Sequence, residues 1–327
     1  MADYKKYQSD GVSAEDKALD KFAELMIEKI ESLKNSDSWK QPWFTEGSLR
    51  WPRNLSGREY NGMNALLLMM LCEKQNYKLP VFCTFNRAVG LNYTTDKQGA
   101  KKPITDADGQ PLPRVGINKG EKSFPVMLTT FTVVDKDTKE KINYEDYKRL
   151  SNDEKAQYNV YPKLNVYQVF NVDQTNLKEA RPDLYAKLES ENKLQRPFSG
   201  EGESFKFPAM DAMIAENKWI CPINLVHQDN AYFSISKNQI TLPEKSQFKD
   251  GESFYGTAFH EMTHSTGTAE MFNRFNPESG FGSAEYAKEE LVAELGSALV
   301  AQRYGMTKNL KDDSAVYMLS LIHISEP

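Results

Sequence analysis

Residues 258–267 read AFHEMTHSTG, with two histidines four positions apart and a glutamate directly after the first. Positions i and i+4 of an α-helix share a face, so His260 and His264 can direct two imidazole nitrogens at one metal ion. Glu261 lies beside them and can take a proton from the water that attacks a substrate carbonyl. The pattern therefore predicts a helix that carries one zinc ion of the kind used in peptide hydrolysis.

A catalytic zinc needs a third protein ligand, and three glutamates compete for this role. Glu270 follows His264 by six residues, at a position where one class of zinc peptidases has a histidine. Glu290 and Glu294 lie in a later predicted helix and share a face, so one can bind the ion while the other hydrogen-bonds a ligating imidazole. We favour Glu290, with Glu294 and Glu270 as the alternatives.

The sequence around this motif predicts two helices and two strands. The motif helix is expected over residues 253–266, and a second helix over residues 283–304. Short strands are expected over residues 232–236 and 239–243. The first of them can serve as an edge strand that holds a substrate backbone, or as a plain core strand. The apolar face of the second helix is expected to comprise Leu291, Leu295, Ala298 and Leu299.

The first half of the chain has a different pattern. Apolar spacings of three and four predict an amphipathic helix over residues 14–34, and a second helix is expected over residues 64–74. Residues 124–134 and 166–172 are rich in β-branched and aromatic side chains and predict strands. The charged residues 135–157 between them indicate a solvated excursion from the sheet. A loop over 97–113 and a linker over 195–208 complete this α+β pattern.

Three of the four tryptophans, Trp39, Trp43 and Trp51, fall within thirteen residues of turn-rich sequence. Aromatic rings interleaved with arginines suit single-stranded nucleic acid, because rings stack on bases and guanidinium groups bind phosphates. The alternative is that these rings pin irregular loops to a small core. On the first interpretation, the DNA-binding residues are Trp43, Arg50, Trp51, Arg53, Arg58, Tyr60 and Lys119.

Composition limits the classes of protein that fit. The chain of 327 residues has 39% hydrophobic and 27% charged residues, which is typical of a globular protein. Its longest apolar run, residues 65–72, is too short to span a bilayer, and its first residues lack a secretory signal. Three widely spaced cysteines suit a reducing cytoplasm. The net charge is −5, yet residues 39–122 hold 13 basic against 7 acidic groups, which suits an anionic partner.

Several motifs in fixed order resemble the ArdC-type antirestriction proteins. They include NLSGREYNGMN at 54–64, FNVDQT at 170–175, FHEMTHSTG at 259–267 and YAKEELVAE at 286–294. The resemblance implies two domains: an α+β domain that binds single-stranded DNA and a zincin-like metallopeptidase domain with the HExxH helix. We expect the first over residues 1–177, a linker over 178–208 and the second over 209–327. The family pattern includes positions 290 and 294 but not 270, which favours Glu290.

The resemblance implies a cytoplasmic protein of a mobile genetic element that protects incoming DNA from host restriction. Its partners would be single-stranded DNA and a protein substrate such as a host restriction subunit, with no membrane involved. The alternative is a DNA-binding protein that protects by coating DNA and whose zinc site is structural or inactive. The family continues with further helices after residue 317, whereas this chain ends in YMLSLIHISEP. We expect that end to be truncated or foreign.

Overall fold

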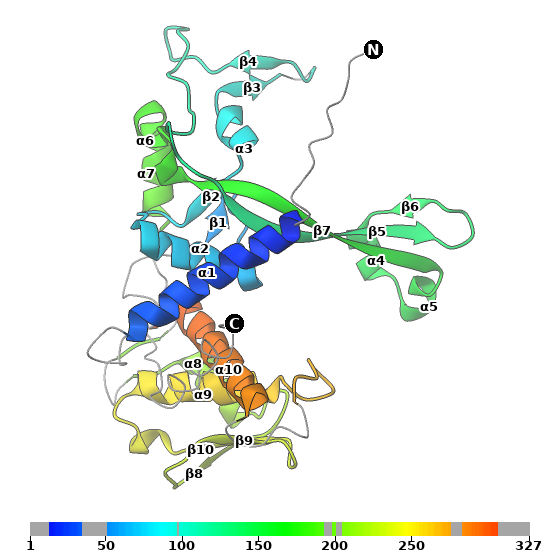
Figure 1. Ribbon diagram of the computed structural model, residues 1–327, viewed down its shortest axis with the longest axis vertical. Coiled ribbons are helices and arrows are strands. Elements are labelled where there is room, and N and C mark those ends of the chain that lie inside the picture. Colours follow the sequence, from blue (N-terminus) through cyan, green and yellow to red (C-terminus); the bar gives the residue numbers. More distant parts are fainter. Residues whose placement is uncertain are drawn as a thin grey trace. The chain divides into compact units, whose positions relative to one another are not determined.

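The computed structural model describes residues 13–34, 51–96, 98–192, 198–200, 205–275 and 283–306. The chain forms two compact units, which Figure 1 shows together with their helices and strands. The first unit holds residues 1–24, 54–58 and 81–185, and the second holds residues 25–53, 59–80 and 186–327. Both contain helices and strands, so the predicted α+β class is confirmed. The domain limits given above stay a prediction.

A long antiparallel strand pair organises the first unit. Strands β5 (Phe124–Asp135) and β7 (Tyr158–Asn171) pair continuously, from Phe124 opposite Val169 to Asp135 opposite Tyr158. Both predicted strands are confirmed, although β7 begins eight residues earlier than the expected strand at 166. Its first part contains Pro162 and Lys163, which interrupt the apolar alternation. The full sheet order is β1-β2-β7-β5-β6, with β1 at Arg53–Asn54, β2 at Val81–Cys83 and β6 at Lys141–Ile142.

The charged residues 135–157 fold onto the far end of the β5–β7 pair. They hold β6 and two short helices, α4 (Tyr144–Arg149) and α5 (Asn152–Lys155), as Figure 1 shows. The ring of Tyr144 stacks on Phe131 of β5 with centroids 4.2 Å apart, and Tyr147 contacts Tyr158 of β7 edge to face. The expected excursion is therefore a small substructure held by a cluster of partly exposed aromatic rings.

Two predicted helices are confirmed, α1 (Ala14–Lys34) and α2 (Gly62–Gln75). Helix α2 buries its whole apolar run from Ala65 to Cys72 and ends at Asn76, whose left-handed backbone has φ 52°. The expected loop over 97–113 contains β4 (Lys101–Pro103), which pairs with β3 (Tyr93–Thr95). The remaining elements up to residue 174 are α3 (Phe85–Gly90) and a short 3-10 turn at Val172–Gln174.

The stretch expected as a linker is partly helical. It begins with α6 (Leu177–Ala180) and α7 (Pro182–Ser190), where Tyr185 and Leu188 are buried. Further along, the rings of Phe198 and Phe205 lie 4.7 Å apart. Burial of Tyr185, Leu188 and Phe205 is favourable, which explains why the described parts of this stretch pack on the rest of the protein.

The second unit contains a three-stranded sheet of order β8-β10-β9. The central strand β10 (Gln239–Pro243) is parallel to β8 (Ile223–Val226) and antiparallel to β9 (Tyr232–Ser234). Strand β9 thus lies at an edge of this sheet, which agrees with the first of the two interpretations given for it above. The helices in this part of the chain, from residue 205 onward, are α8 (Pro208–Ala215), α9 (Gly251–Ser265) and α10 (Ala284–Arg303), with a 3-10 turn at Lys245–Gln247.

Helix α9 packs on one face of this sheet. Ile240 and Leu242 of β10 are fully buried in one core cluster with Phe254, Ala258 and Phe259 of α9. This apolar face of α9 fixes its rotation about its own axis, and so determines which way its polar residues point. Within the described ranges, no helix is both long and apolar enough to cross a bilayer.

Candidate metal centre

Helix α9 places the two histidines of the motif. Its first turn is capped by Asp250, whose side chain accepts a hydrogen bond from Ser253 N. The start of the helix packs closely on Phe205. A Cβ atom on Gly251 would lie only 2.5 Å from the Cβ of Phe205, so this position requires a glycine. His260 and Glu261 are 3% and 4% exposed, so the motif lies inside the unit rather than on its surface.

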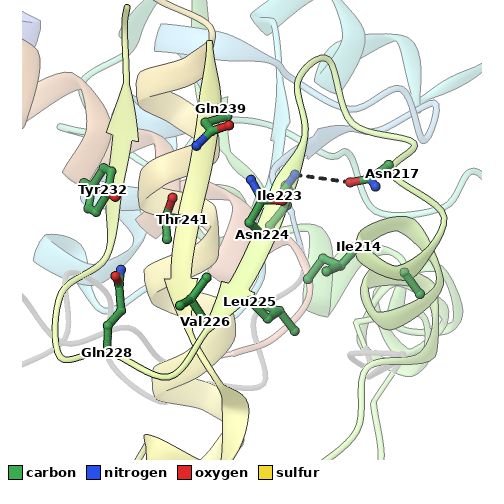
Figure 2. Close-up of a pocket in the computed structure, with 11 residues that line it drawn as sticks. Ile214, Asn217, Ile223, Asn224, Leu225, Val226, Gln228, Tyr232, Gln239 and Thr241 are labelled. Carbon is green, nitrogen blue, oxygen red and sulfur yellow. Dashed lines mark hydrogen bonds between the residues drawn. The ribbon is translucent and has the colours of Figure 1, made fainter. Parts of the chain in front are cut away.

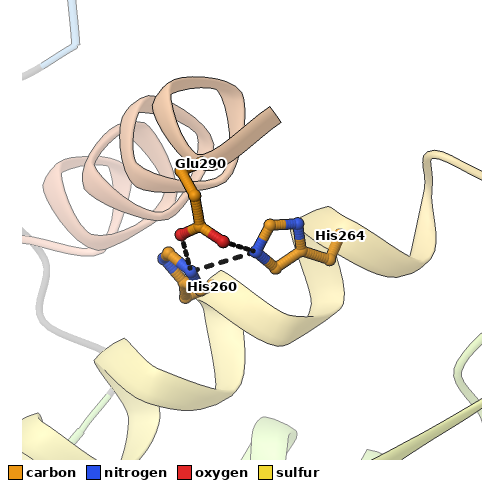
Figure 3. A group of neighbouring side chains, drawn as sticks. All are labelled: His260, His264 and Glu290. Atoms are coloured by element: carbon orange, nitrogen blue, oxygen red, sulfur yellow. Dashed lines mark hydrogen bonds and ion pairs between the residues drawn. The ribbon is translucent and has the colours of Figure 1, made fainter. Parts of the chain in front are cut away.

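His260, His264 and Glu290 bring three ligand atoms together, as Figure 3 shows. The two imidazole Nε2 atoms lie 3.1 Å apart, and the Glu290 carboxylate oxygens lie 3.4 Å and 3.5 Å from them. A tetrahedral zinc with ligands at about 2.0–2.1 Å keeps those ligand atoms about 3.4 Å apart. The donor set and its spacing therefore fit a tetrahedral divalent ion with one further position.

The three competing glutamates occupy different places. Glu290 lies on α10 and points its carboxylate at both histidines. Glu294, one turn further along α10, is fully buried and its Oε2 lies 3.2 Å from His260 Nδ1. Glu270 is exposed in the turn after α9 and is not a member of the group. This arrangement favours Glu290 as the ligand and Glu294 as the partner of the first imidazole.

A second carboxylate stands behind the other histidine. Glu289 Oε1 lies 3.2 Å from His264 Nδ1, and Arg274 binds both oxygens of Glu289. Each imidazole thus has a carboxylate at Nδ1 and presents Nε2 to the metal group. Glu289 and Arg274 were missed in the sequence, because Arg274 comes from the loop after α9 and no fixed spacing links it to a glutamate on α10.

The charges of the site favour an ionised Glu290. Burial by itself would raise the pKa of this carboxyl group, but the hydrogen bond with His260 and the charges of His264 and His260 hold it at about 2. Burial likewise acts to raise the pKa of Glu289, and the hydrogen bonds from His264 and Arg274 outweigh it and lower that pKa. Both carboxylates are therefore anionic at neutral pH, as a metal ligand and its supporting group must be.

Close packing of α9 and α10 makes these contacts possible. A Cβ atom on Gly296 would stand 2.6 Å from Thr263 Cγ2, so only a glycine allows the helices to approach this closely. The expected apolar face of α10 is largely wrong: Leu291, Leu295 and Leu299 are only half-buried. The buried positions are instead taken by small residues and one acid, because large side chains would hold the helices apart: Ala287, Ala293, Glu294, Ser297, Ala298 and Ala301.

Two family models match the chain. Residues 16–170 match the N-terminal domain of the anti-restriction factor ArdC, and residues 208–325 match a zincin-like metallopeptidase domain. The chain is an ArdC-type two-domain protein. Both ArdC-type domains follow in the predicted order, so the resemblance drawn from the motifs is confirmed.

Solved structures share the fold of this ArdC-type chain, and curated relatives match it in sequence. The antirestriction ArdC protein from plasmid R388 has a metal-free and a Mn(II)-bound crystal structure, both with a TM-score of 0.58. They are 22% and 21% identical and cover 93% of this chain and 88% of theirs, which shows a common fold. Two Escherichia coli proteins named DNA primase TraC are 30% and 25% identical over 87% and 88% of this chain. The chain spans 17% and 23% of their lengths.

The residues predicted to bind DNA have different environments in the ArdC-type fold. Trp43 and Arg50 lie outside the described residues. Trp51 is half-buried, and its ring N–H donates to the carbonyl oxygen of Tyr60. The side chain of Arg53 is 14% exposed and its Nη1 lies 2.9 Å from Glu191 Oε2. Among the members that the structure describes, Arg58 and Lys119 are exposed.

A cavity of about 620 Å³ lies on the other face of the three-stranded sheet from α9 (Figure 2). Thr241 and Gln239 of β10 line it, whereas their neighbours Ile240 and Leu242 face the α9 core. Tyr232 of β9 contributes from the edge strand. The cavity is therefore separate from the metal group, none of whose members lines it.

Proposed function

We propose that this chain is an antirestriction protein of a mobile genetic element that binds single-stranded DNA and carries a zinc-dependent peptidase site. The observation that supports the peptidase most strongly is the spacing of the three ligand atoms of His260, His264 and Glu290. Glu261 follows directly after the first of them on α9. The ArdC and zincin-like family matches, and the Mn(II)-bound R388 structure of the same fold, support the same conclusion.

The chain's own residues divide the chemistry between them. A bound zinc would supply a Lewis acid that polarises the scissile carbonyl and activates water. His260, His264 and Glu290 would hold it, and Glu261 would accept the proton of the attacking water and pass it to the leaving amine. Because Glu261 is only 4% exposed, bulk water competes little for this proton. The outer carboxylates of Glu289 and Glu294 would keep both imidazoles in the tautomer that faces the ion.

The substrate backbone would bind along strand β9. This strand pairs with β10 through Tyr232, Phe233 and Ser234, and it occupies an edge of its sheet. An extended peptide can add to such an edge through main-chain hydrogen bonds. The peptide would then be a protein met on the DNA, such as a host restriction subunit, because the DNA-binding domain would bring the site to it.

Glutamine at position 261 tests the peptidase directly. Glu261→Gln keeps the size of the side chain but cannot take up the proton, so cleavage should fall by roughly 10²-fold or more while zinc remains bound. Glu270→Gln is the matched control, because Glu270 is exposed and outside the metal group. The measurements are zinc content, cleavage of candidate restriction subunits, and survival of incoming unmodified DNA.

The outcome separates two mechanisms of protection. If Glu261→Gln loses both cleavage and protection, the peptidase is the mechanism. If it keeps zinc and full protection, the peptidase is not the mechanism of protection, and coating of single-stranded DNA by the protein is the mechanism instead.

A further inference from the structure

Arg274 turns back from the loop after α9 onto the end of that helix. Its Nη2 donates to the carbonyl oxygen of Thr263 at 2.9 Å, and its Nη1 donates to Thr266 Oγ1 at 3.0 Å. The last carbonyl groups of a helix lack partners within the helix, and a cation near them is favourable. These two hydrogen bonds from the guanidinium group therefore cap the C-terminal end of α9.

The other edge of the guanidinium serves Glu289 on α10. Arg274 Nε donates to Oε2 and Nη2 donates to Oε1, both at 2.9 Å, which is the bidentate arrangement of a strong ion pair. Glu289 Oε1 also lies 3.2 Å from His264 Nδ1. The side chains of Glu289 and Arg274 are 13% and 21% exposed, so solvent screens this pair only in part. A continuous chain of contacts leads from Arg274 to the second histidine.

We propose that Arg274 and Glu289 form a positioning pair that fixes the tautomer of His264. A carboxylate at Nδ1 favours the imidazole with its proton on Nδ1, which leaves the Nε2 lone pair directed at His260 and Glu290. The bidentate ion pair with Arg274 also holds the Glu289 carboxylate away from the metal site. Glu289 therefore does not compete with its neighbour Glu290 for the metal ion. This inference rests on the proposed metal-binding function and adds Arg274, which acts on His264 through Glu289.

A purely structural cap makes a different prediction. If Arg274 only ties the loop to α9, its loss lowers stability but leaves His264 as it was. The tautomer of a histidine can be measured in the metal-free protein, so the two roles are separable without any assay of activity. The chain has four histidines, which keeps the spectrum simple, and His264→Asn identifies the signal of His264.

The experiment compares Arg274→Lys and Glu289→Gln with the wild-type full chain. Two-bond ¹H–¹⁵N spectra are recorded on metal-free protein above the usual histidine pKa of about 6.5. We expect the wild type to hold His264 as the Nδ1–H form and both variants to show a mixture of tautomers. Zinc affinity, measured by competition with a chelator, should fall roughly 10–100-fold in both variants.

Arg181→Lys is the matched control, because it makes the same change in another arginine that donates to carbonyl oxygens, those of Pro113 and Leu91. It should leave the His264 signal and zinc affinity at wild-type values. The proposal is overturned if Arg274→Lys and Glu289→Gln retain the wild-type tautomer and bind zinc within about two-fold of wild type, whatever their melting temperatures. Absence of zinc binding in the wild type would instead refute the metal-binding function, and the tautomer spectra would still decide the role of the pair.

Discussion

Arg53 and Arg58 show how residues of one type in one stretch can differ in role. Arg58 is exposed, whereas Arg53 is largely enclosed and pairs with Glu191, which lies 138 residues further along the chain. We expect Arg58→Ala to weaken single-stranded DNA binding and to reduce the slope of log affinity against log salt by about 0.7, the value for one phosphate contact. Its melting temperature should stay that of the wild type.

Arg53→Ala serves as the contrast in the same titrations. It should lower the free energy of unfolding by roughly 1 kcal/mol, because it breaks a partly shielded ion pair. Fluorescence titration with an oligonucleotide and thermal melts measure both effects. An unchanged salt slope in Arg58→Ala would remove Arg58 from the DNA interface.

Cys83 predicts how stability responds to alkaline pH. This thiol is buried in β2, and burial raises its pKa from 9.0 to about 11. Because the folded pKa lies above the unfolded one, its contribution is complete below pH 9 and is lost as the pH rises to about 11. The difference corresponds to a free energy of about 3 kcal/mol. The free energy of unfolding, measured with urea below and above pH 9, should show this loss. In Cys83→Ala the free energy of unfolding should fall less steeply with rising pH. Identical curves would contradict the assignment to Cys83.

At the scale of elements, the crossing of α9 and α10 depends on Gly296. Alanine in a helix interior normally gains up to about 1 kcal/mol over glycine. Here the added methyl would meet Thr263 at 2.6 Å, so Gly296→Ala should instead destabilise by roughly 1–3 kcal/mol and weaken zinc binding by moving Glu290. Thermal melts and zinc titrations measure both effects.

Two variants complete this test of the helix crossing. The double change Gly296→Ala with Thr263→Ala removes the conflicting side chain and should recover much of the loss. Gly116→Ala is the control, since nothing lies within 4 Å of its Cβ position. Stabilisation by Gly296→Ala alone would show that the crossing is looser than described.

The same two helices show how far the sequence could predict the site. The motif of His260 and His264 is local, so its helix and the proposed metal site could be predicted from spacing alone. Spacing left Glu290, Glu294 and Glu270 open as the third ligand, and the resemblance to the ArdC-type family favoured Glu290. Glu289 could not be predicted, because its place behind His264 depends on the rotation of α10 against α9. That rotation is set by small buried residues such as Ala293, which the search for an apolar face passed over in favour of leucines.

At the scale of the whole molecule, metal binding should stabilise the second unit. Glu290 and Glu294 lie 3.4 Å and 3.2 Å from the two ring nitrogens of His260, and a divalent cation would offset the repulsion between their carboxylates. At a free zinc concentration of about 100 times Kd, binding to the folded state alone adds roughly 2.7 kcal/mol. Calorimetry should show a higher melting temperature for the protein with zinc than for the protein without it.

Replacing the competing glutamates tests the third ligand in the same measurement. Glu290→Ala should abolish the zinc-dependent rise, whereas Glu270→Ala should retain it, because Glu270 is exposed and outside the metal group. The opposite pattern would assign the third ligand to Glu270.

The far end of the β5–β7 pair has a consequence for engineering. Phe131, Tyr144, Tyr147 and Tyr158 pack on one another there, so the tip is held by its own side chains. Thr130 and Lys163 lie directly opposite in the ladder, at the point where this tip begins. An Asn-Gly turn joining them would close a shorter hairpin with the twist that two-residue turns favour. We therefore expect that the residues between Thr130 and Lys163 can be replaced by a fluorophore, a crosslinker or a foreign domain. The sequence of the metal centre would stay unchanged.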